Sequence, residues 1–290
     1  MIVAGDILTE AVFGLSGEQL AALPSIYKEN LLQGKTAVIS GGSGGIGKSI
    51  AWLYSRLGAK VVLLGRDAAK LRQVKADIES AGGLVAVFNV NIKDPDAVRA
   101  VQQEIIAQQG GFDILVNCAG GQFPRPAIDI SDNGWRAVVD TNLSGTWFMM
   151  QTAARYWRDQ KRAGIIINIV TVVDRGMVDM AHSCAARAGV IHLSKTVAIE
   201  WAQYNIRTNC IAPGVIASEG MAVYTDAARA PFPDSNPMKR FGSPWEIAQA
   251  AVYYGSDASA FITGDTMTVD GGGRLWGDLW PHGKPDYFRV

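Results

Sequence analysis

The residues in this chain best suited to chemistry lie in a glycine-rich turn. The turn, Ser40-Gly41-Gly42-Ser43-Gly44-Gly45-Ile46-Gly47, follows an apolar run at 36–39 and precedes a helical pattern that starts near Ile50. Glycines let a backbone turn sharply and approach a phosphate closely. The following helix offers unpaired N–H groups and the positive end of its dipole to an anion. The sequence therefore predicts a dinucleotide pyrophosphate site, held by Gly41, Ser43, Gly45 and Ile46.

The end of the next apolar run indicates which dinucleotide is bound. An acidic residue there would accept hydrogen bonds from a ribose 2′-hydroxyl, but this chain has Gly65 followed by Arg66. An arginine can pair with a 2′-phosphate, and the Ser43 hydroxyl could add a hydrogen bond. We therefore expect NADP(H) to be preferred, with NAD(H) still possible. The alternative is that Arg66 is solvated and that Asp67 only caps the following helix.

Apolar strands and helical segments alternate along most of the chain. Strands are expected near 36–40, 60–64, 84–90, 113–116, 164–170, 206–211 and 265–269, with helices near 46–58, 67–81, 94–109, 132–160, 182–203 and 243–255. This alternation predicts a Rossmann-type α/β fold, which is a doubly wound seven-stranded parallel sheet with helices on both faces. Cofactor and substrate would then meet at the carboxyl ends of the strands.

The chain is expected to have three parts. These are an N-terminal extension (1–33), a single dinucleotide-binding domain (34–273) that contains a substrate loop (215–242), and an aromatic C-terminal tail (274–290). The extension is expected to hold a short helix capped by Ser16. The substrate loop has no clear periodicity, as is typical of a lid, and its Met221, Tyr224 and Phe232 could line an acyl slot or only anchor the loop. The tail is expected to pack over the site or over a neighbouring subunit.

Composition narrows the possible function classes. The 290 residues carry zero formal net charge, which gives no sign of a nucleic-acid-binding surface. Three cysteines and three histidines show no metal-ligand spacing. The longest apolar run, 165–173, is far shorter than the ~20 residues that cross a bilayer, and the N-terminus lacks a signal-peptide core. We expect a cytoplasmic protein with a small-molecule substrate, without a metal, and with neither nucleic acid nor membrane as a partner.

Several motifs, in consistent order, resemble those of the short-chain dehydrogenase/reductase family over 34–273. The glycine turn resembles the family's TGxxxGIG, residues 117–120 resemble NNAG, Asn142 stands where the family keeps an active-site asparagine, Pro213-Gly214 resembles PG, and 270–272 resemble the closing DGG. The resemblance implies a homodimer or homotetramer. It also implies further cofactor contacts at Asn91, Ile92, Asn117, Ala119, Gly120, Arg187, Pro213, Gly214 and Ile216.

The catalytic positions depart from the family pattern. The family usually presents a serine and, further along, Tyr-x-x-x-Lys, in which the tyrosine is the acid or base for a carbonyl and the lysine holds the nicotinamide ribose. Here these positions are Thr171, Ser183 and Arg187, and no tyrosine lies between Tyr156 and Tyr204. Ser183 and Arg187 would share one face of a helix. The resemblance makes these three residues, with Asn142, candidates for the catalytic site.

The changed residues favour one kind of reduction over another. Reducing a ketone makes an alkoxide, which needs a proton from a group that titrates in a useful range; Ser183 and Arg187 make a poor proton relay. Reducing a C=C bond conjugated to a thioester does not need such an acid, because the charge spreads onto the thioester oxygen, where hydrogen-bond donors can stabilise it. The substitution resembles peroxisomal-type trans-2-enoyl-CoA and 2,4-dienoyl-CoA reductases, in which an amide such as Gln122 can face the thioester carbonyl. We therefore predict NADPH-dependent reduction of a 2-enoyl acyl-CoA, in fatty acid metabolism, with Ser183 and Gln122 as donors.

Two alternatives remain open. The substrate loop and the tail also resemble bacterial citronellol or citronellal dehydrogenases, which would make the chain an NAD(P)-dependent dehydrogenase of a branched alcohol or aldehyde. The loss of the family's tyrosine and lysine could instead mark a nucleotide-binding scaffold without catalysis. His182 is expected to pack or cap rather than to act as the missing acid, because it would point about 100° away from Ser183 on a helix.

Overall fold

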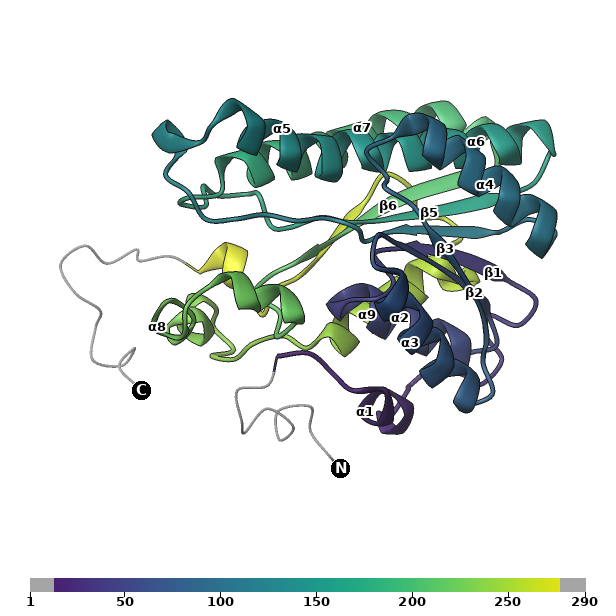
Figure 1. Cartoon of the computed structure of the whole chain (residues 1–290), viewed down its shortest axis with the longest axis horizontal. Helices are drawn as coiled ribbons and strands as arrows, with labels where there is room; N and C mark the ends of the chain where they lie inside the picture. The colour runs from purple at the N-terminus through teal and green to yellow at the C-terminus, as the bar shows by residue number, and fades with distance from the viewer. Residues whose placement is uncertain (1–12, 277–290) are drawn as a thin grey trace.

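The computed structural model describes residues 13–276 and contains a sheet of seven parallel strands (Figure 1). The strands follow the order β3-β2-β1-β4-β5-β6-β7. Their bounds are β1 Thr36–Ser40, β2 Lys60–Gly65, β3 Leu84–Asn89, β4 Ile114–Asn117, β5 Gly164–Ile169, β6 Ile206–Pro213 and β7 Thr266–Val269. The order reverses between β1 and β4, the switch point beyond which doubly wound folds bind ligands. The expected Rossmann-type fold is confirmed.

Helices cover both faces of this sheet (Figure 1). One face carries α2 (Gly45–Arg56), α3 (Ala68–Ser80) and α9 (Pro244–Gly255), with the short α1 (Gly17–Ala22) beside them; the other carries α4 (Pro95–Gln109), α5 (Asp132–Val139), α6 (Gly145–Asp159) and α7 (Ala181–Trp201). The substrate loop contains α8 (Asp226–Arg229). Short 3₁₀ turns lie at Ala127–Asp129, Ala202–Tyr204, Glu219–Val223, Phe232–Ser235, Asp257–Ser259 and Gly273–Leu275. Across the described residues, none of these helices combines the length and the apolar character that a membrane crossing requires.

Alternate residues of the central strands supply two separate hydrophobic cores. Ile39 of β1 and Val61 of β2 pack on the side of α2 and α9, together with Trp52. Their neighbours Val38 and Val62 pack on the side of α4 and α6. The strands are therefore apolar on both faces, as a sheet covered on both sides requires. This packing holds the carboxyl ends of the strands in fixed positions around the site.

The helix expected over 132–160 is interrupted in its middle. α5 ends at Val139 and α6 begins at Gly145, and a single π turn, Asp140–Ser144, joins them. In a π turn the backbone hydrogen bonds span five residues, and such turns are frequent at functional sites. The turn buries Asn142 completely.

The described part of the expected N-terminal extension packs against α2. Ser16 caps α1 as expected, because its hydroxyl accepts a hydrogen bond from the Gln19 N–H, and the Gln19 side chain accepts one from the Ser16 N–H. Leu20 is fully buried, and Arg56 of α2 donates hydrogen bonds of 2.8 Å to the Leu20 and Leu23 carbonyl oxygens. The rest of the extension (1–12) and the tail from residue 277 lie outside the described residues.

Candidate active site

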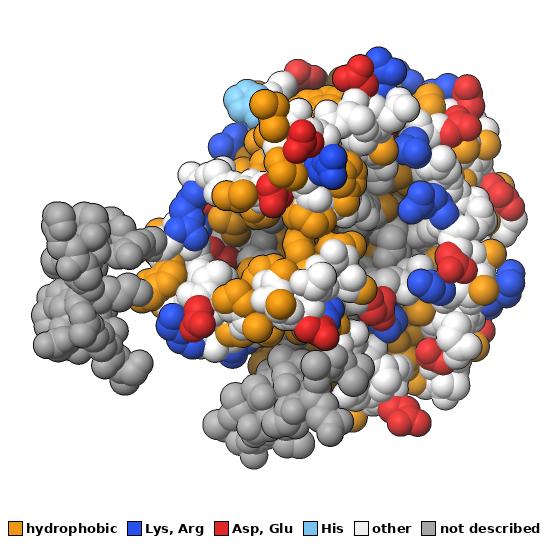
Figure 2. Space-filling model, turned by 60° about the vertical axis from the view of Figure 1, so that its left-hand side comes forward, with side chains coloured by type: hydrophobic (Ala, Val, Ile, Leu, Met, Phe, Trp, Pro, Cys, Tyr) orange, Lys and Arg blue, Asp and Glu red, His pale blue; other side chains and the backbone are white. Residues whose placement is uncertain are grey.

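A cavity of about 710 Å³ opens at the carboxyl edge of the sheet. Figure 2 shows a hollow with hydrophobic side chains gathered around it. The substrate loop contributes Met221 and Val223 to the wall of the cavity. The sequence-predicted residues on this wall are Gly41, Ser43, Gly45, Ile46, Arg66, Asn91, Ile92, Ala119, Gly120, Gln122, Thr171, Arg187, Pro213, Gly214 and Ile216.

The glycine turn approaches its neighbours too closely for side chains. A Cβ on Gly41, which has a φ of +70°, would lie 2.8 Å from the Ala119 nitrogen, and one on Gly47 would lie 2.2 Å from the Gly41 carbonyl oxygen. Helix α2 starts at Gly45 without a side-chain cap from Gly44, but its Gly45 N–H is held at 3.1 Å by the Glu219 carboxylate. An anionic group thus already lies where the helix end would receive a phosphate. This cradle fits the pyrophosphate of a dinucleotide.

The β2 end of the cavity is positively charged. Arg66 and Lys70 both line the wall there, and neither side chain has a hydrogen-bond or ion-pair partner among the described residues. Asp67 turns its carboxylate toward α3 instead, where it accepts hydrogen bonds of 3.0 Å from the Ala69 N–H and 3.1 Å from the Lys70 N–H. Asp67 also lines the cavity, but its carboxylate is engaged in capping α3, whereas the two cations beside it have no such partner. The residues at this end fit a phosphorylated ribose of NADP(H).

Asn142 holds the loop that follows β4. Its side-chain oxygen accepts a hydrogen bond of 3.0 Å from the Gly121 N–H, and its amide nitrogen donates one of 2.9 Å to the Gly121 carbonyl. Asn142 does not itself line the cavity. It therefore positions the backbone on which Gly120 and Gln122 stand.

Arg187 is a cation on the wall of the cavity: protein surrounds its guanidinium, although the residue as a whole is only partly buried. Its guanidinium donates a hydrogen bond to the Ile169 carbonyl, and Gly120 leaves room for it, since a Cβ there would lie 2.2 Å from Arg187 Nη2. Burial lowers the pKa of Arg187, and no carboxylate pairs with it among the described residues. A buried charge of this kind is costly unless a polar or anionic group satisfies it. The hydroxyls of a nicotinamide ribose would do so.

Three side chains from distant parts of the chain form a hydrogen-bonded row. Ser183, in the first turn of α7, donates a hydrogen bond of 2.8 Å from its hydroxyl to Gln122 Oε1. Gln122 Nε2 donates one of 3.1 Å to the hydroxyl oxygen of Tyr224 in the substrate loop. The two predicted donors thus lie together. Tyr224 was expected at most to line an acyl slot, and the structure places its phenol beside the catalytic candidates.

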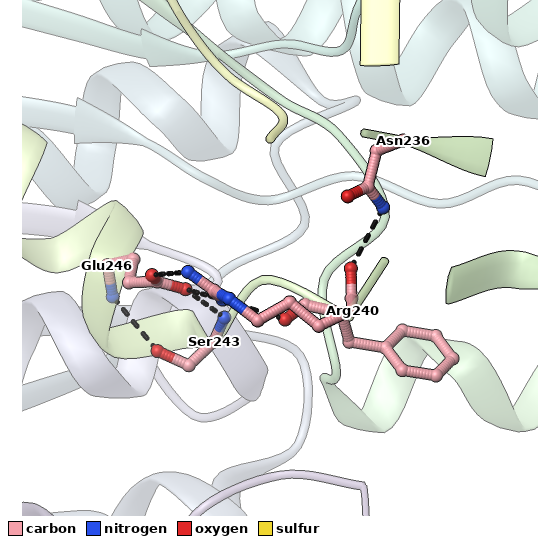
Figure 3. Close-up of polar contacts among 5 residues, drawn as sticks. Asn236, Arg240, Ser243 and Glu246 are labelled. Atoms are coloured by element: carbon pink, nitrogen blue, oxygen red, sulfur yellow. Dashed lines mark hydrogen bonds and ion pairs between the residues drawn. The ribbon is translucent and has the colours of Figure 1, made fainter. Parts of the chain in front are cut away.

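The substrate loop is tied down at both ends. Near its start, Glu219 accepts hydrogen bonds of 3.1 Å from the Gly45 N–H and 2.9 Å from Lys48 Nζ. Near its end, Arg240 forms a two-pronged ion pair with Glu246, with bonds of 2.6 and 3.0 Å, and Asn236 donates a hydrogen bond to the Arg240 carbonyl (Figure 3). Ser243 and Glu246 together cap the start of α9. Tyr224 is thus carried by a loop with defined anchors.

Three further residues from the sequence analysis, Thr171, Asn117 and His182, lie in different surroundings. Thr171 lines the cavity without a side-chain hydrogen bond to any described residue. Asn117 lies off the wall, where it is buried and donates a hydrogen bond of 2.8 Å to Asn168. His182 is fully buried; its Nδ1 accepts a hydrogen bond from the Ser183 N–H, and its ring meets Phe123 edge-on. His182 thus packs inside the protein, one of the two roles expected for it, while the start of α7 has no side-chain cap.

Sequence comparisons relate most of this chain to known reductases. A family model described as enoyl-(acyl carrier protein) reductase matches residues 41–273. A probable 2,4-dienoyl-CoA reductase, (2E)-enoyl-CoA-producing, from Bacillus subtilis (strain 168) is 39% identical over 83% of this chain and 97% of its own length. A 3-oxoacyl-(acyl-carrier-protein) reductase from Chlamydia trachomatis is 36% identical over 83% of this chain and 98% of its own length.

Solved structures show the same fold. A citronellol catabolism dehydrogenase from Pseudomonas aeruginosa PAO1 superimposes with a TM-score of 0.78 and 35% identity, over 87% of this chain and all of the other. A putative NAD(P)-dependent gluconate 5-dehydrogenase from Beutenbergia cavernae, solved with NADP at low occupancy, gives a TM-score of 0.80 at 29% identity, over 86% of this chain and all of the other.

Proposed function

The chain belongs to the short-chain dehydrogenase/reductase family and is an oxidoreductase, and we propose that it reduces the C=C bond of a 2-enoyl thioester, such as an acyl-CoA, with NADPH. When bound, the nicotinamide supplies a hydride, and that chemistry is the cofactor's own. The protein orients the two reactants next to each other and stabilises the charge that develops on the thioester oxygen.

The cofactor preference rests on charge at the β2 end of the cavity. Arg66 and Lys70 line the wall where a ribose would lie, and β2 ends in Gly65 rather than in an acidic residue. A 2′-phosphate would meet two cations there, whereas the one carboxylate nearby, Asp67, already accepts the hydrogen bonds that cap α3. These contacts support NADP(H) over NAD(H).

The observation that carries the proposed reaction is the Ser183–Gln122 hydrogen bond of 2.8 Å, with the Arg187 guanidinium one helical turn further along α7. The Ser183 hydroxyl fixes the Gln122 carboxamide, and amide and guanidinium N–H groups can donate hydrogen bonds to an enolate-like oxygen. None of the three can readily accept the proton of an alcohol near neutral pH.

The phenol of Tyr224 does not restore alcohol oxidation. Burial raises the pKa of Tyr224, and the hydrogen bond from Gln122 offsets this only in part. Tyr224 therefore keeps its proton at neutral pH and is a donor rather than a base. The site as built favours reduction of an activated double bond.

The test is turnover by the purified protein with a panel of substrates. We expect NADPH to be consumed with crotonyl-CoA, with a longer trans-2-enoyl-CoA or with a 2,4-dienoyl-CoA, and Ser183→Ala to lower kcat. Faster reduction of NADP⁺ by citronellol would favour the branched-alcohol alternative, and faster reduction of a 3-oxoacyl thioester would favour carbonyl chemistry. Tight NADPH binding with no turnover of any of these would indicate a scaffold.

We also infer that the protein is a homodimer or homotetramer and that it works in the cytoplasm. Exposed apolar side chains such as Ile199, Phe261 and Trp135 support a homodimer or homotetramer, because apolar surface favours contact between subunits. The described cysteines Cys118, Cys184 and Cys210 are free thiols, which supports a reducing, cytoplasmic setting. Light scattering of the purified protein tests the first inference.

A further inference from the structure

The hydrogen-bonded row of Ser183, Gln122 and Tyr224 has a direction. The Ser183 hydroxyl donates a hydrogen bond to the Gln122 side-chain carbonyl, and the Gln122 amide donates one to the Tyr224 oxygen. Tyr224 thus accepts one hydrogen bond, while its own O–H meets no acceptor among the described residues. Because a phenol both donates and accepts, one strong donor is left over at the outer end of the row.

The surroundings of Tyr224 keep this donor beside the cavity. The ring is half-buried and meets Phe232 edge-on, with 5.2 Å between the ring centres. The phenol accepts a hydrogen bond from Gln122, which lines the cavity. Val223, the residue before Tyr224, also lines it. Tyr224 is not itself among the residues of the cavity wall, so its phenol lies next to the wall, with its oxygen held by the Gln122 amide.

We propose that Tyr224 is a catalytic residue, whose phenol donates a hydrogen bond to the carbonyl oxygen of the acyl substrate, while Gln122 and Ser183 position the phenol. This inference rests on the proposed function and deepens it, since it names the donor that the substrate carbonyl meets. It also gives the row its order: Ser183 holds the Gln122 amide, Gln122 holds the phenol, and the phenol faces the substrate.

The donor comes from a segment outside the sheet and helices that build the rest of the site. Tyr224 lies between the Glu219 anchor and the Arg240–Glu246 anchor of the substrate loop. The substrate-binding arrangement is complete only when this loop is seated, so loop seating and stabilisation of the oxyanion are coupled. A chain with an unseated loop would bind NADPH and yet be slow in the chemical step.

The experiment compares Tyr224→Phe with Tyr204→Phe, which removes the same hydroxyl at the opposite edge of the sheet, just before β6. With crotonyl-CoA and NADPH, we expect Tyr224→Phe to lower kcat by about 10²-fold, as the loss of one oxyanion donor does. The dissociation constant for NADPH, measured by its fluorescence, and the midpoint of thermal unfolding should stay at wild-type values. Tyr204→Phe should match the wild type in all three.

A second measurement reads the hydrogen bond without turnover. Bound 2,4-hexadienoyl-CoA, with NADP⁺ in place of NADPH, should absorb at longer wavelength in the wild type, because a donor on its carbonyl polarises the conjugated system. We expect Tyr224→Phe to lose most of that shift. Gln122→Leu should lose it as well, and the double variant should lose no more, because the two residues act as one unit.

The two proposals fail in different ways. Wild-type turnover of enoyl thioesters together with unchanged kcat and an unchanged absorbance shift in Tyr224→Phe would overturn the role of Tyr224 and leave the proposed function standing. A wild-type protein that neither turns over nor polarises any acyl thioester would overturn both. An equal loss of kcat in Tyr204→Phe would also refute a specific role for the Tyr224 phenol.

Discussion

At the scale of single residues, Gly120 shows how little space the site leaves. A Cβ on Gly120 would lie 2.2 Å from Arg187 Nη2 and 3.0 Å from Asn142 Oδ1. We expect Gly120→Ala to lower kcat/KM by at least about tenfold, because the buried guanidinium or the asparagine must move. Gly176 offers a control: it lies off the cavity wall and a Cβ on it meets nothing within 4 Å, so Gly176→Ala should stay near the wild type. Equal activity of the two variants would contradict the tight packing around Arg187.

Arg66 decides the cofactor preference at the same scale. Its side chain lines the cavity and has no partner among the described residues, so a 2′-phosphate would be its ion-pair partner. Arg66→Ala should weaken NADPH binding by about tenfold and leave NADH binding unchanged, since charge-assisted hydrogen bonds are the strong ones. Fluorescence titration measures both constants, and Arg72→Ala on the exposed side of α3 is the control. Equal weakening of both cofactors would mean that Arg66 does not recognise the phosphate.

At the scale of elements, the cap of α9 makes the substrate loop sensitive to acid. Burial alone would raise the pKa of Glu246, but hydrogen bonds from Arg240 and Ser243, together with the charge of Arg240, outweigh it and lower the pKa. The folded pKa therefore lies below the unfolded value of ~4.3. Ionised Glu246 stabilises the fold above that pH, and this stabilisation is lost as the pH falls through the folded pKa.

Glu246→Gln tests this anchor. The variant should lose about 1 kcal/mol or less of unfolding free energy at neutral pH, because the ion pair is only half-buried. The difference from the wild type should vanish below the folded pKa, where the wild-type side chain is also neutral. Urea unfolding across this pH range measures both, with the exposed Glu200→Gln as control. A difference that persists in acid would assign the effect to packing rather than to charge.

The elements also show where sequence reasoning reaches its limit. Strand and helix alternation and the glycine turn were enough for the sheet and for the cofactor turn, because apolar runs and turns are local properties of the chain. Most of the other predicted residues of the cavity wall came from the family resemblance. The sequence analysis expected one helix over 132–160 and did not predict the π turn at 140–144, because a single extra residue in one turn leaves the flanking helical pattern on both sides intact. That turn is what aims Asn142 at Gly121.

At the scale of the whole molecule, the site joins segments that no local pattern connects. Gln122 and Tyr224 are 102 residues apart, and Gln122 and Ser183 are 61 apart. Ser183 and Arg187 could be assigned because they stand at the tyrosine and lysine positions of the family motif, whereas the place of Tyr224 depends on how the substrate loop folds back across the strand ends. Sequence periodicity carries no information on that path, because the loop has no regular element long enough to show it.

Glu219 couples the substrate loop to the cofactor cradle, and this coupling can be measured. Its carboxylate accepts the Gly45 N–H at the start of α2 and pairs with Lys48, so it stands where the helix end would receive the pyrophosphate. Two anions cannot share that donor, so a bound pyrophosphate would displace the Glu219 carboxylate from the Gly45 N–H, while Lys48 can still hold it as the anchor of the substrate loop. Glu219→Gln should therefore tighten NADPH binding by about fivefold, the effect of one charge at a helix terminus, and the gain should shrink at high salt. Glu29→Gln, at an exposed position, controls for net charge. Weaker NADPH binding in Glu219→Gln would show instead that the carboxylate and the cofactor are held together.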